Sequence, residues 1–339
     1  MLFQTLFLLC CLLCANAFCE SPCCGSPDIE LPKHLGETAV KYKKDVMEHW
    51  KEKYAEFIGE RQVPDITKKF LIRVGVMGAG KSSAVDNYID AHSSEFGVAD
   101  GNAFPLIDLD GMVMTAPEYY RLTCDGKRRR APGGADPWWE GQKEIDGYAI
   151  KTELTVAARQ KGQTFSSEST GKNIYNVKGL KKLIVDGNCK SDDGETNVAG
   201  CFYPGDLKAK DYEVFAVSPF VPYYDLKKRL DERTRRTGRA VPFKEVTENI
   251  EAYYPNVKGL MEDVDFHLVS NQVAQGENPV LMAKSVGGVQ CRTNVVEQTE
   301  KNINEQADEY ADVPEVLEAE INLINDLKQI TKICKEKQD

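Results

Sequence analysis

The sequence predicts an α/β fold in which a parallel β-sheet is covered by helices on both faces. Short apolar, β-rich runs alternate along the chain with longer segments of helical periodicity. That order is typical of strands joined by crossover helices, and strands buried on both faces read as continuous apolar runs. The composition is globular, with 42% hydrophobic and 28% charged residues over 339 positions, so the chain can bury a large core.

Five segments have the composition of buried strands, because they are short and rich in β-branched, aromatic and other apolar residues. They are residues 70–76, 103–110, 163–170, 212–220 and 266–271. Where a parallel strand ends, open α/β sheets bind their ligands. Polar residues that follow these runs are therefore the first candidates for a functional site.

Helices are predicted where apolar residues return every three or four positions. Such periodicity covers residues 36–60 and 143–161, and a further helix is expected at 81–92. In the second of these segments the predicted apolar face consists of Tyr148, Ile150, Leu154, Val156 and Ala157.

The tail, residues 295–338, is rich in Glu, Asn, Lys and Gln but keeps a helical apolar stripe. The stripe consists of Val316, Leu317, Ile321, Ile324, Leu327 and Ile330. We expect this helix to pack back on the core. A partner-binding or coiled-coil helix is the alternative, although the stripe spans few heptads.

Residues 1–17 resemble a cleaved secretory signal peptide. An almost unbroken apolar run, too short to cross a bilayer, precedes the small-residue site Ala15-Asn16-Ala17. We therefore expect a protein of the secretory pathway or the extracellular space, without a transmembrane segment in the mature chain. The alternatives are a buried N-terminal helix and a bipartite plastid leader, for which Phe18 would be the first mature residue.

Cleavage after Ala17 would leave eight cysteines, an even number that is compatible with disulfides in a secreted chain. Cys189 and Cys201 enclose a polar loop and are the preferred pair, with two reduced surface thiols as the alternative. The cluster of Cys19, Cys23 and Cys24 has no histidine nearby, which disfavours a zinc site there.

One motif indicates phosphate binding. Gly75, Gly80, Lys81 and Ser82 fit the pattern G-x-x-x-x-G-K-[ST], between a predicted strand and a predicted helix. Such a loop turns its backbone N–H groups toward phosphate oxygens, and its lysine reaches the β- and γ-phosphates. We expect ATP to bind at Gly75, Gly78, Ala79, Gly80, Lys81, Ser82 and Ser83. Mg²⁺ would be held through the nucleotide and the Ser82 hydroxyl. The fold expected is thus of the P-loop NTPase type.

The segment 106–112, "LIDLDGM", places Asp108 and Asp110 at the end of a predicted buried strand. Two positions apart, both carboxylates would face one side of that strand. One could accept a proton from an acceptor hydroxyl, and the other could anchor a water on Mg²⁺. Solvated carboxylates at a strand end are the structural alternative.

The chain resembles the zeta-toxin family of P-loop kinases over residues 65–272. The shared order is "GVMGAGKSS", "IDLDGMVMTAPEYYRL", "AARQKGQTFSSESTGKN", "RLDERTRRTGRAVP" and "DFHLVSNQ". The resemblance implies that Asp110 is the base toward a sugar hydroxyl of UDP-N-acetylglucosamine. It also implies that Glu168, Ser169 and Thr170 contact the acceptor. Ser169 stands where the family has glycine, which would narrow the pocket.

The family places arginines on a lid helix over the phosphates, and "TGRAVP" points to Arg239. Arg229 and Arg233 are both candidates for a second arginine. Guanidinium groups suit phosphate geometry and stabilise charge during transfer. A further basic run, residues 125–139, precedes two tryptophans; a surface loop or a processing site is the preferred interpretation, and a loop near the acceptor is the alternative.

We therefore predict four parts: a signal peptide (1–17), a lead-in and N-terminal helix (18–64), a zeta-toxin-like P-loop kinase domain (65–273) and a helical C-terminal extension (274–339). The expected activity is transfer of the γ-phosphoryl group of ATP to a hydroxyl of a small molecule, such as a nucleotide sugar. The alternatives are a kinase for a nucleic-acid end or another metabolite, and a nucleotide-binding interaction protein without turnover. The net charge of −10 argues against general nucleic-acid binding.

Overall fold

The computed structural model describes residues 68–113, 116, 119, 137–190, 205, 207–237, 241–273, 277–285 and 290–336. The chain divides into two compact units. Residues 55–108, 152–227 and 242–339 form one, called the sheet unit, and residues 1–54, 109–151 and 228–241 form the other, called the helical unit. The predicted helix at 36–60, the signal peptide and the lead-in lie outside the described residues.

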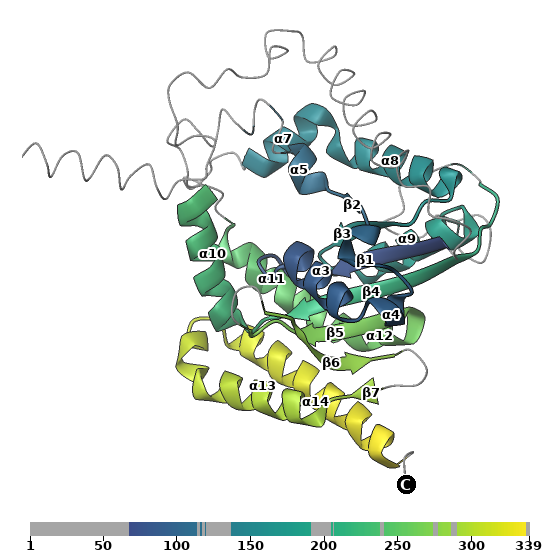
Figure 1. Ribbon diagram of the computed structural model, residues 1–339. Coiled ribbons are helices and arrows are strands. Elements are labelled where there is room, and N and C mark those ends of the chain that lie inside the picture. Colours follow the sequence, from purple (N-terminus) through teal and green to yellow (C-terminus); the bar gives the residue numbers. More distant parts are fainter. Residues whose placement is uncertain are drawn as a thin grey trace, which may run out of the picture. The chain divides into compact units, whose positions relative to one another are not determined.

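The sheet unit is built on a seven-stranded sheet with the strand order β2-β3-β1-β4-β5-β6-β7 (Figure 1). Its strands are β1 (Lys68–Val74), β2 (Leu106–Ile107), β3 (Phe165–Ser169), β4 (Tyr212–Phe220), β5 (Asp265–Ser270), β6 (Val280–Lys284) and β7 (Gln290–Cys291). All neighbours from β2 to β5 are parallel, while β6 and β7 are antiparallel additions at one edge. The P-loop NTPase-type α/β fold predicted from the sequence is confirmed.

Helices of the sheet unit include α3 (Lys81–Ala91), α4 (Ser93–Phe96), α9 (Ile174–Asp186), α11 (Phe243–Tyr253), α12 (Val257–Asp263), α13 (Thr293–Glu305) and α14 (Pro314–Glu336). Short 3₁₀ turns lie at η1 (Gly101–Ala103), η2 (Tyr254–Asn256) and η3 (Ala307–Tyr310). The boundary between the units falls within α8 (Gly147–Lys161) and α10 (Tyr223–Thr237).

Helix α3 packs on the sheet through residues three and four positions apart. Val85, Tyr88 and Ile89 are fully buried and join a cluster with Leu71 of β1 and Phe215 of β4. Burial of such side chains stabilises the fold by about 1.5–3 kcal/mol each. The helix that begins at the phosphate motif is thereby fixed to the two central strands.

The described part of the helical unit consists of α5 (Leu109–Val113), α7 (Pro137–Ile145), the start of α8 and the later turns of α10. Two glycines allow its helices to approach closely. A Cβ on Gly141 would lie 2.9 Å from Tyr119 Cβ, and a Cβ on Gly147 would lie 2.8 Å from Leu109 Cδ1. The packing around Asp110, on α5, is therefore tight.

The structure corrects the predicted strand at 103–110. Strand β2 has only two residues, because it is an edge strand that pairs with β3 alone at Leu106 and Ile107. Asp108 follows that strand, but Asp110 already lies in the first turn of α5. The prediction that both carboxylates share one face of a strand is wrong.

Two further segments differ from prediction. The helix expected at 143–161 is interrupted at Asp146, which has a φ of 53° and separates α7 from α8. Tyr148, assigned to an apolar face, is 40% exposed.

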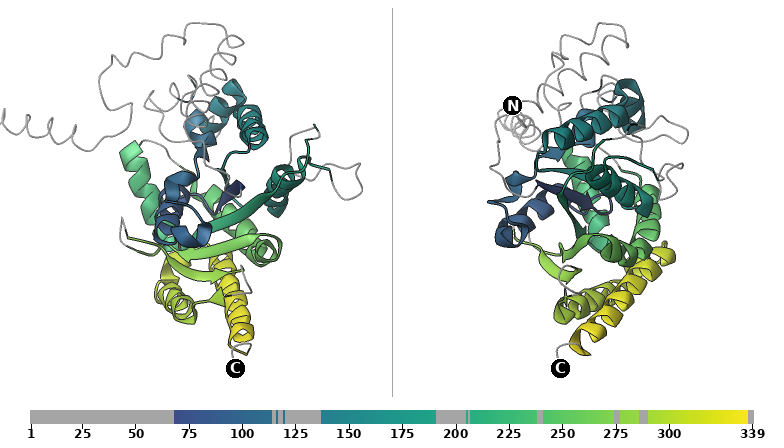
Figure 2. Two further views of the ribbon diagram at one scale, coloured as in Figure 1. Left: turned by 45° about the vertical axis from the view of Figure 1, so that its right-hand side comes forward. Right: turned by 90° about the vertical axis from the view of Figure 1, so that its right-hand side faces the viewer.

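The extension 274–339 is not helical throughout, since it begins with β6 and β7. Helices α13 and α14 then lie side by side along that edge of the sheet, so the expectation that the tail packs back on the core is confirmed (Figures 1 and 2).

Candidate functional site

The phosphate motif forms a tight loop between β1 and α3. Gly75, Gly78 and Gly80 have backbone φ values of 148°, 86° and 83°, which residues other than glycine rarely adopt. A Cβ on Gly80 would also come within 3.0 Å of Asn271 Nδ2. The glycines of the motif are therefore required by the shape of this loop, as the sequence predicts.

Two buried asparagines from distant parts of the chain hold the loop. Asn271 Nδ2 donates a hydrogen bond to the Ala79 carbonyl at 2.9 Å. Asn249 Oδ1 accepts one from the Met77 N–H at 3.3 Å, and its Nδ2 donates to the Thr170 carbonyl at 3.3 Å. Sequence reasoning missed both residues; only the position of Asn271, directly after a buried strand, was a signal.

The first turn of α3 carries the predicted ATP-binding side chains. Lys81 Nζ donates to the Val76 carbonyl at 3.4 Å, so its ammonium group lies over the loop. Ser82 and Ser83 are exposed, and α3 has no acidic residue in its first turn. The N-terminus of this helix, with its N–H groups and the partial positive charge of its dipole, is thus suited to a phosphate.

The end of β3 lies beside this loop, because β1 and β3 are parallel neighbours with Val74 opposite Ser169. The Gly75 N–H donates to the Ser169 carbonyl at 3.1 Å. Ser82 Oγ donates to Glu168 Oε1 at 2.9 Å. Glu168 therefore contacts the hydroxyl that is predicted to ligate Mg²⁺. The acceptor contacts expected of Glu168, Ser169 and the exposed Thr170 remain predictions.

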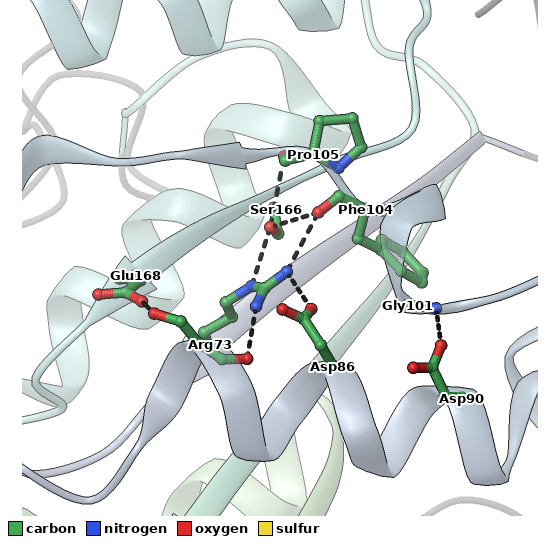
Figure 3. A network of polar contacts seen from close by, with 9 residues as sticks. Arg73, Asp86, Asp90, Gly101, Phe104, Pro105, Ser166 and Glu168 are labelled. Atoms are coloured by element: carbon green, nitrogen blue, oxygen red, sulfur yellow. Dashed lines mark hydrogen bonds and ion pairs between the residues drawn. The ribbon is translucent and has the colours of Figure 1, made fainter. Parts of the chain in front are cut away.

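A buried arginine supports the first turn of α3 from the sheet side (Figure 3). Arg73, on β1, is 2% exposed. Its guanidinium donates to Ser166 Oγ at 3.0 Å, to the Ser82 carbonyl at 3.1 Å and to the Phe104 carbonyl at 3.1 Å. It also pairs with Asp86 at 2.8 Å. Burial raises the pKa of the Asp86 carboxyl, and the charge of Arg73 opposes that rise.

This arginine was not among the predicted site residues, although a single cation inside the apolar run "FLIRVGV" was a visible signal. A charge in a buried strand is rarely found without partners. Arg73 joins β1, β3 and α3, and its bond to the Ser82 carbonyl holds the first turn of α3 against these strands.

In the helical unit, Asp110 has a defined partner on α7. Trp138 Nε1 donates to Asp110 Oδ1 at 2.8 Å, and both side chains are half-buried. Burial raises the pKa of the Tyr148 hydroxyl on α8, and the negative charge of Asp110 raises it further. Sequence reasoning noted the tryptophans but gave neither of them nor Tyr148 a role beside Asp110.

The predicted arginines lie on α10. Arg229 and Arg233 are half-buried, and their spacing of four places them on one side of the helix. Arg239 lies outside the described residues. The structure thus groups the phosphate loop with Glu168 in the sheet unit, while Asp110, Arg229 and Arg233 belong to the helical unit.

Cys189 is buried and disulfide-bonded. Cys201, its predicted partner, lies outside the described residues, so the pairing stays a prediction.

Within the described ranges, no group of three or more His, Cys, Asp or Glu side chains could hold a metal ion. Among the same residues, no helix has the length and apolar character needed to cross a membrane.

A scan against protein-family models and a search of curated proteins find no match. Among solved structures, the chain is similar to one from the PezAT chromosomal toxin–antitoxin system of the human pathogen Streptococcus pneumoniae. The identity is 15%, the TM-score is 0.46, and 84% of this chain and 96% of that chain are covered.

It is also similar to the AvrRxo1-ORF1:AvrRxo1-ORF2 complex, determined with sulphate ions and with ATP. For the former the identity is 11% and the TM-score 0.44, with 84% of each chain covered. For the latter the values are 10% and 0.42, with 86% of this chain and 88% of that chain covered. All these TM-scores lie below 0.5, so the roles proposed below depend on this chain's own residues. In the order of its sequence motifs, the chain resembles the zeta-toxin family of P-loop kinases.

Proposed function

We propose that this protein is a phosphotransferase that moves the γ-phosphoryl group of ATP to a hydroxyl of a small molecule. The observation that carries the proposal is the glycine loop ending in Lys81 and Ser82, with Glu168 of the neighbouring strand bonded to the Ser82 hydroxyl. A loop of this shape at a helix N-terminus binds phosphate. A carboxylate beside the serine suits a nucleotide that carries a divalent cation.

Each residue has a proposed role in the transfer. The loop N–H groups and Lys81 hold the β- and γ-phosphates, and Ser82 with Glu168 holds the cation side of the nucleotide. Mg²⁺, when bound with ATP, would neutralise charge on the phosphates. Arg239 and one of Arg229 and Arg233 stabilise the transferring group. Within the sheet unit, Asn249 and Asn271 hold the backbone of the loop in place through their hydrogen bonds to Met77 and Ala79.

Asp110 is proposed as the base. The acceptor oxygen forms a bond to the γ-phosphorus while the bond from that phosphorus to the β-phosphate oxygen breaks. The hydroxyl proton passes to the Asp110 carboxylate, and ADP leaves with the negative charge. Asp108, Glu168, Ser169 and Thr170 are proposed acceptor contacts, as the resemblance implies. UDP-N-acetylglucosamine is the first acceptor to test for the same reason.

The test is mass spectrometry of a metabolite mixture incubated with the full chain and ATP. We expect one or more metabolites to gain a phosphoryl group. In Lys81→Ala we expect transfer to fall by at least about 100-fold, since that cation contacts the transferring group. Lys172→Ala is a matched control, because Lys172 is an exposed lysine of the same unit, paired with Glu248 at 3.3 Å.

Each alternative has its own outcome. ATP binding without transfer to any metabolite would overturn the phosphotransferase and leave a nucleotide-binding protein. Transfer to nucleic-acid ends, with affinity that falls steeply as salt rises, would replace the small-molecule acceptor. Full activity of Asp110→Asn would remove Asp110 from the role of base.

A further inference from the structure

The carboxylate of Asp110 is held by an indole. Trp138 Nε1 donates to Asp110 Oδ1 at 2.8 Å, a length typical of a hydrogen bond to a charged acceptor. Trp138 reaches Asp110 from the first turn of α7, while Asp110 lies in the first turn of α5. The bond thus joins two helices of the helical unit at the residue that the proposed function makes the base.

An indole N–H is suited to orient a base without competing with it. It donates a hydrogen bond but can neither accept a proton nor become charged at accessible pH. A donor on one carboxylate oxygen stabilises the ionised form, and it fixes the plane of the group. The carboxylate is then kept ready to accept a proton, with its orientation set before an acceptor arrives.

The helices that carry the pair are locked together. A Cβ on Gly141, one turn after Trp138 on α7, would lie 3.2 Å from Val113 Cγ1 at the end of α5. A Cβ on Gly147, at the start of α8, would lie 2.8 Å from Cδ1 of Leu109, the neighbour of Asp110 on α5. Trp138 is further held edge-on by Trp139 at 5.4 Å between ring centroids. Its indole therefore has little freedom to leave the carboxylate.

One titratable side chain of α8, Tyr148, lies near both Trp138 and Asp110. The ring of Tyr148 lies 6.3 Å from that of Trp138, and the charge of Asp110 contributes to the raised pKa of its hydroxyl. On α7 itself, Glu140 and Lys143 pair with each other at 2.9 Å. Because its pKa is raised, the Tyr148 hydroxyl stays neutral at physiological pH and adds no charge beside Asp110.

We propose that Trp138 is a positioning residue for Asp110, whose indole N–H holds the carboxylate in the ionised state and in the orientation needed to take the acceptor proton. This role rests on the proposed function, because it requires Asp110 to be the base. Trp138 is not proposed to touch the acceptor. It acts on Asp110 through the hydrogen bond from its indole N–H.

The test compares Trp138→Phe with Trp139→Phe in the full chain. Phenylalanine keeps an aromatic ring but removes the donor. We expect Trp138→Phe to lower kcat by about 10- to 100-fold, less than loss of a general base itself, with little change in KM for the acceptor. The acidic limb of the kcat/KM profile should move to higher pH, because the carboxylate loses a bond that favours its charged form. Trp139→Phe should leave that limb in place.

A second measurement does not depend on activity. In ¹⁵N-labelled protein, the indole N–H resonance of Trp138, assigned by its loss in Trp138→Phe, should shift upfield in Asp110→Ala, while that of Trp139 stays in place. An unshifted Trp138 resonance, or an unmoved acidic limb in Trp138→Phe, would overturn the proposed positioning. Absence of transfer in the unmodified protein, with the resonance shift present, would instead overturn the kinase function and leave a structural pair.

Discussion

At the scale of single residues, the guanidinium of Arg73 joins the sheet to the phosphate loop. Three hydrogen-bond acceptors and one carboxylate surround it inside the sheet unit. Removing it takes away three hydrogen bonds from a charged donor, although Ser166 Oγ and the Phe104 carbonyl stay bonded to each other at 3.0 Å. A hydrogen bond to a charged group contributes about 1.5–3 kcal/mol. The Asp86 side chain is 41% exposed as a whole, but its Oδ1, which faces Arg73, is buried. Loss of Arg73 therefore also removes the cation that pairs with this oxygen.

We therefore expect Arg73→Met to lower the free energy of unfolding by about 2–5 kcal/mol, as measured by urea denaturation. Arg73→Lys should recover only part of this, because an ammonium group cannot reproduce the planar set of donors. As a control, Lys172→Met at an exposed position should change stability by about 0.5 kcal/mol or less. Wild-type stability in Arg73→Met would contradict the supporting role of this residue.

Gly171, next to the proposed acceptor contact Thr170, is a second position fixed by its surroundings. Its φ is +70°, and a Cβ there would lie 2.2 Å from Tyr253 Cδ2 and 2.9 Å from Val74 Cγ1. Tyr253 cannot easily retreat, because it is fully buried and its hydroxyl is bonded to Ser218 Oγ at 2.6 Å.

Gly171→Ala should therefore cost about 2–5 kcal/mol, the sum of left-handed strain and overpacking. Gly162→Ala is the matched control. Its φ is +71°, but a Cβ there would meet only the flexible end of Lys68, at 2.8 Å. That variant should cost about 1–2 kcal/mol from strain alone. Equal losses in thermal or urea unfolding would show that the Tyr253 contact is unimportant.

The residues of the phosphate loop could be predicted from the sequence because the motif is local. Gly75 to Ser83 are consecutive, and their geometry follows from the backbone freedom of glycine. Asn249 and Asn271 could not be predicted, since they lie 172 and 192 positions from the loop atoms they bind. Asn249 lies on α11 and Asn271 follows β5, so only the packing of the folded sheet unit brings them to the loop. Trp138 lies 28 positions from Asp110 and meets it only because α5 and α7 pack together.

At the scale of elements, the start of α10 is held by a buried carboxyl of the C-terminal helix α14. Glu320 Oε1 accepts from the Tyr223 N–H at 2.8 Å, and Oε2 accepts from the Tyr310 hydroxyl at 2.6 Å. Burial raises the pKa of Glu320 to about 8, and Asp225 adds to the rise, although both donors oppose it. The sequence predicted the apolar stripe of α14 but gave no reason to expect an acid within that helix to be fully buried.

A carboxyl whose pKa is higher in the folded than in the unfolded state holds its proton after the unfolded chain has lost it. Stability should therefore fall as pH rises from about 5 to about 8, by up to about 1.4 kcal/mol per pH unit, and level off above. Glu320→Gln should remove this slope when urea midpoints are compared across that range. Glu318→Gln, at an exposed position of the same helix, should keep it. An unchanged slope in Glu320→Gln would refute the assignment.

The short β2 shows why element boundaries were harder to predict than element types. The segment 103–110 is apolar enough for a strand, but an edge position offers β2 hydrogen bonds from β3 only. The chain turns into α5 after two paired residues, and Asp110 becomes helical. By contrast, β4 has the predicted bounds, because it lies in the middle of the sheet between two parallel neighbours.

At the scale of the sheet unit, the C-terminal extension is part of the fold that carries the phosphate loop. Strands β6 and β7 continue the sheet beyond β5, and α13 and α14 pack against them. Asn271, which holds the loop, lies between β5 and β6. We therefore expect the extension to unfold together with the central strands, rather than as a separate folding unit.

Shared unfolding of the extension and the central strands predicts that a cavity in α14 also destabilises the strand beside the phosphate loop. Ile324 of α14 is fully buried, so Ile324→Ala should lower stability by about 2–5 kcal/mol. If the sheet unit unfolds as one structure, hydrogen exchange of the β1 amides, next to the loop, should quicken as much as that of α14. Ile321→Ala, at a half-buried position of the same helix, should have a smaller effect on both. Faster exchange in α14 alone, with β1 unchanged, would mean that the extension unfolds independently and does not support the phosphate site.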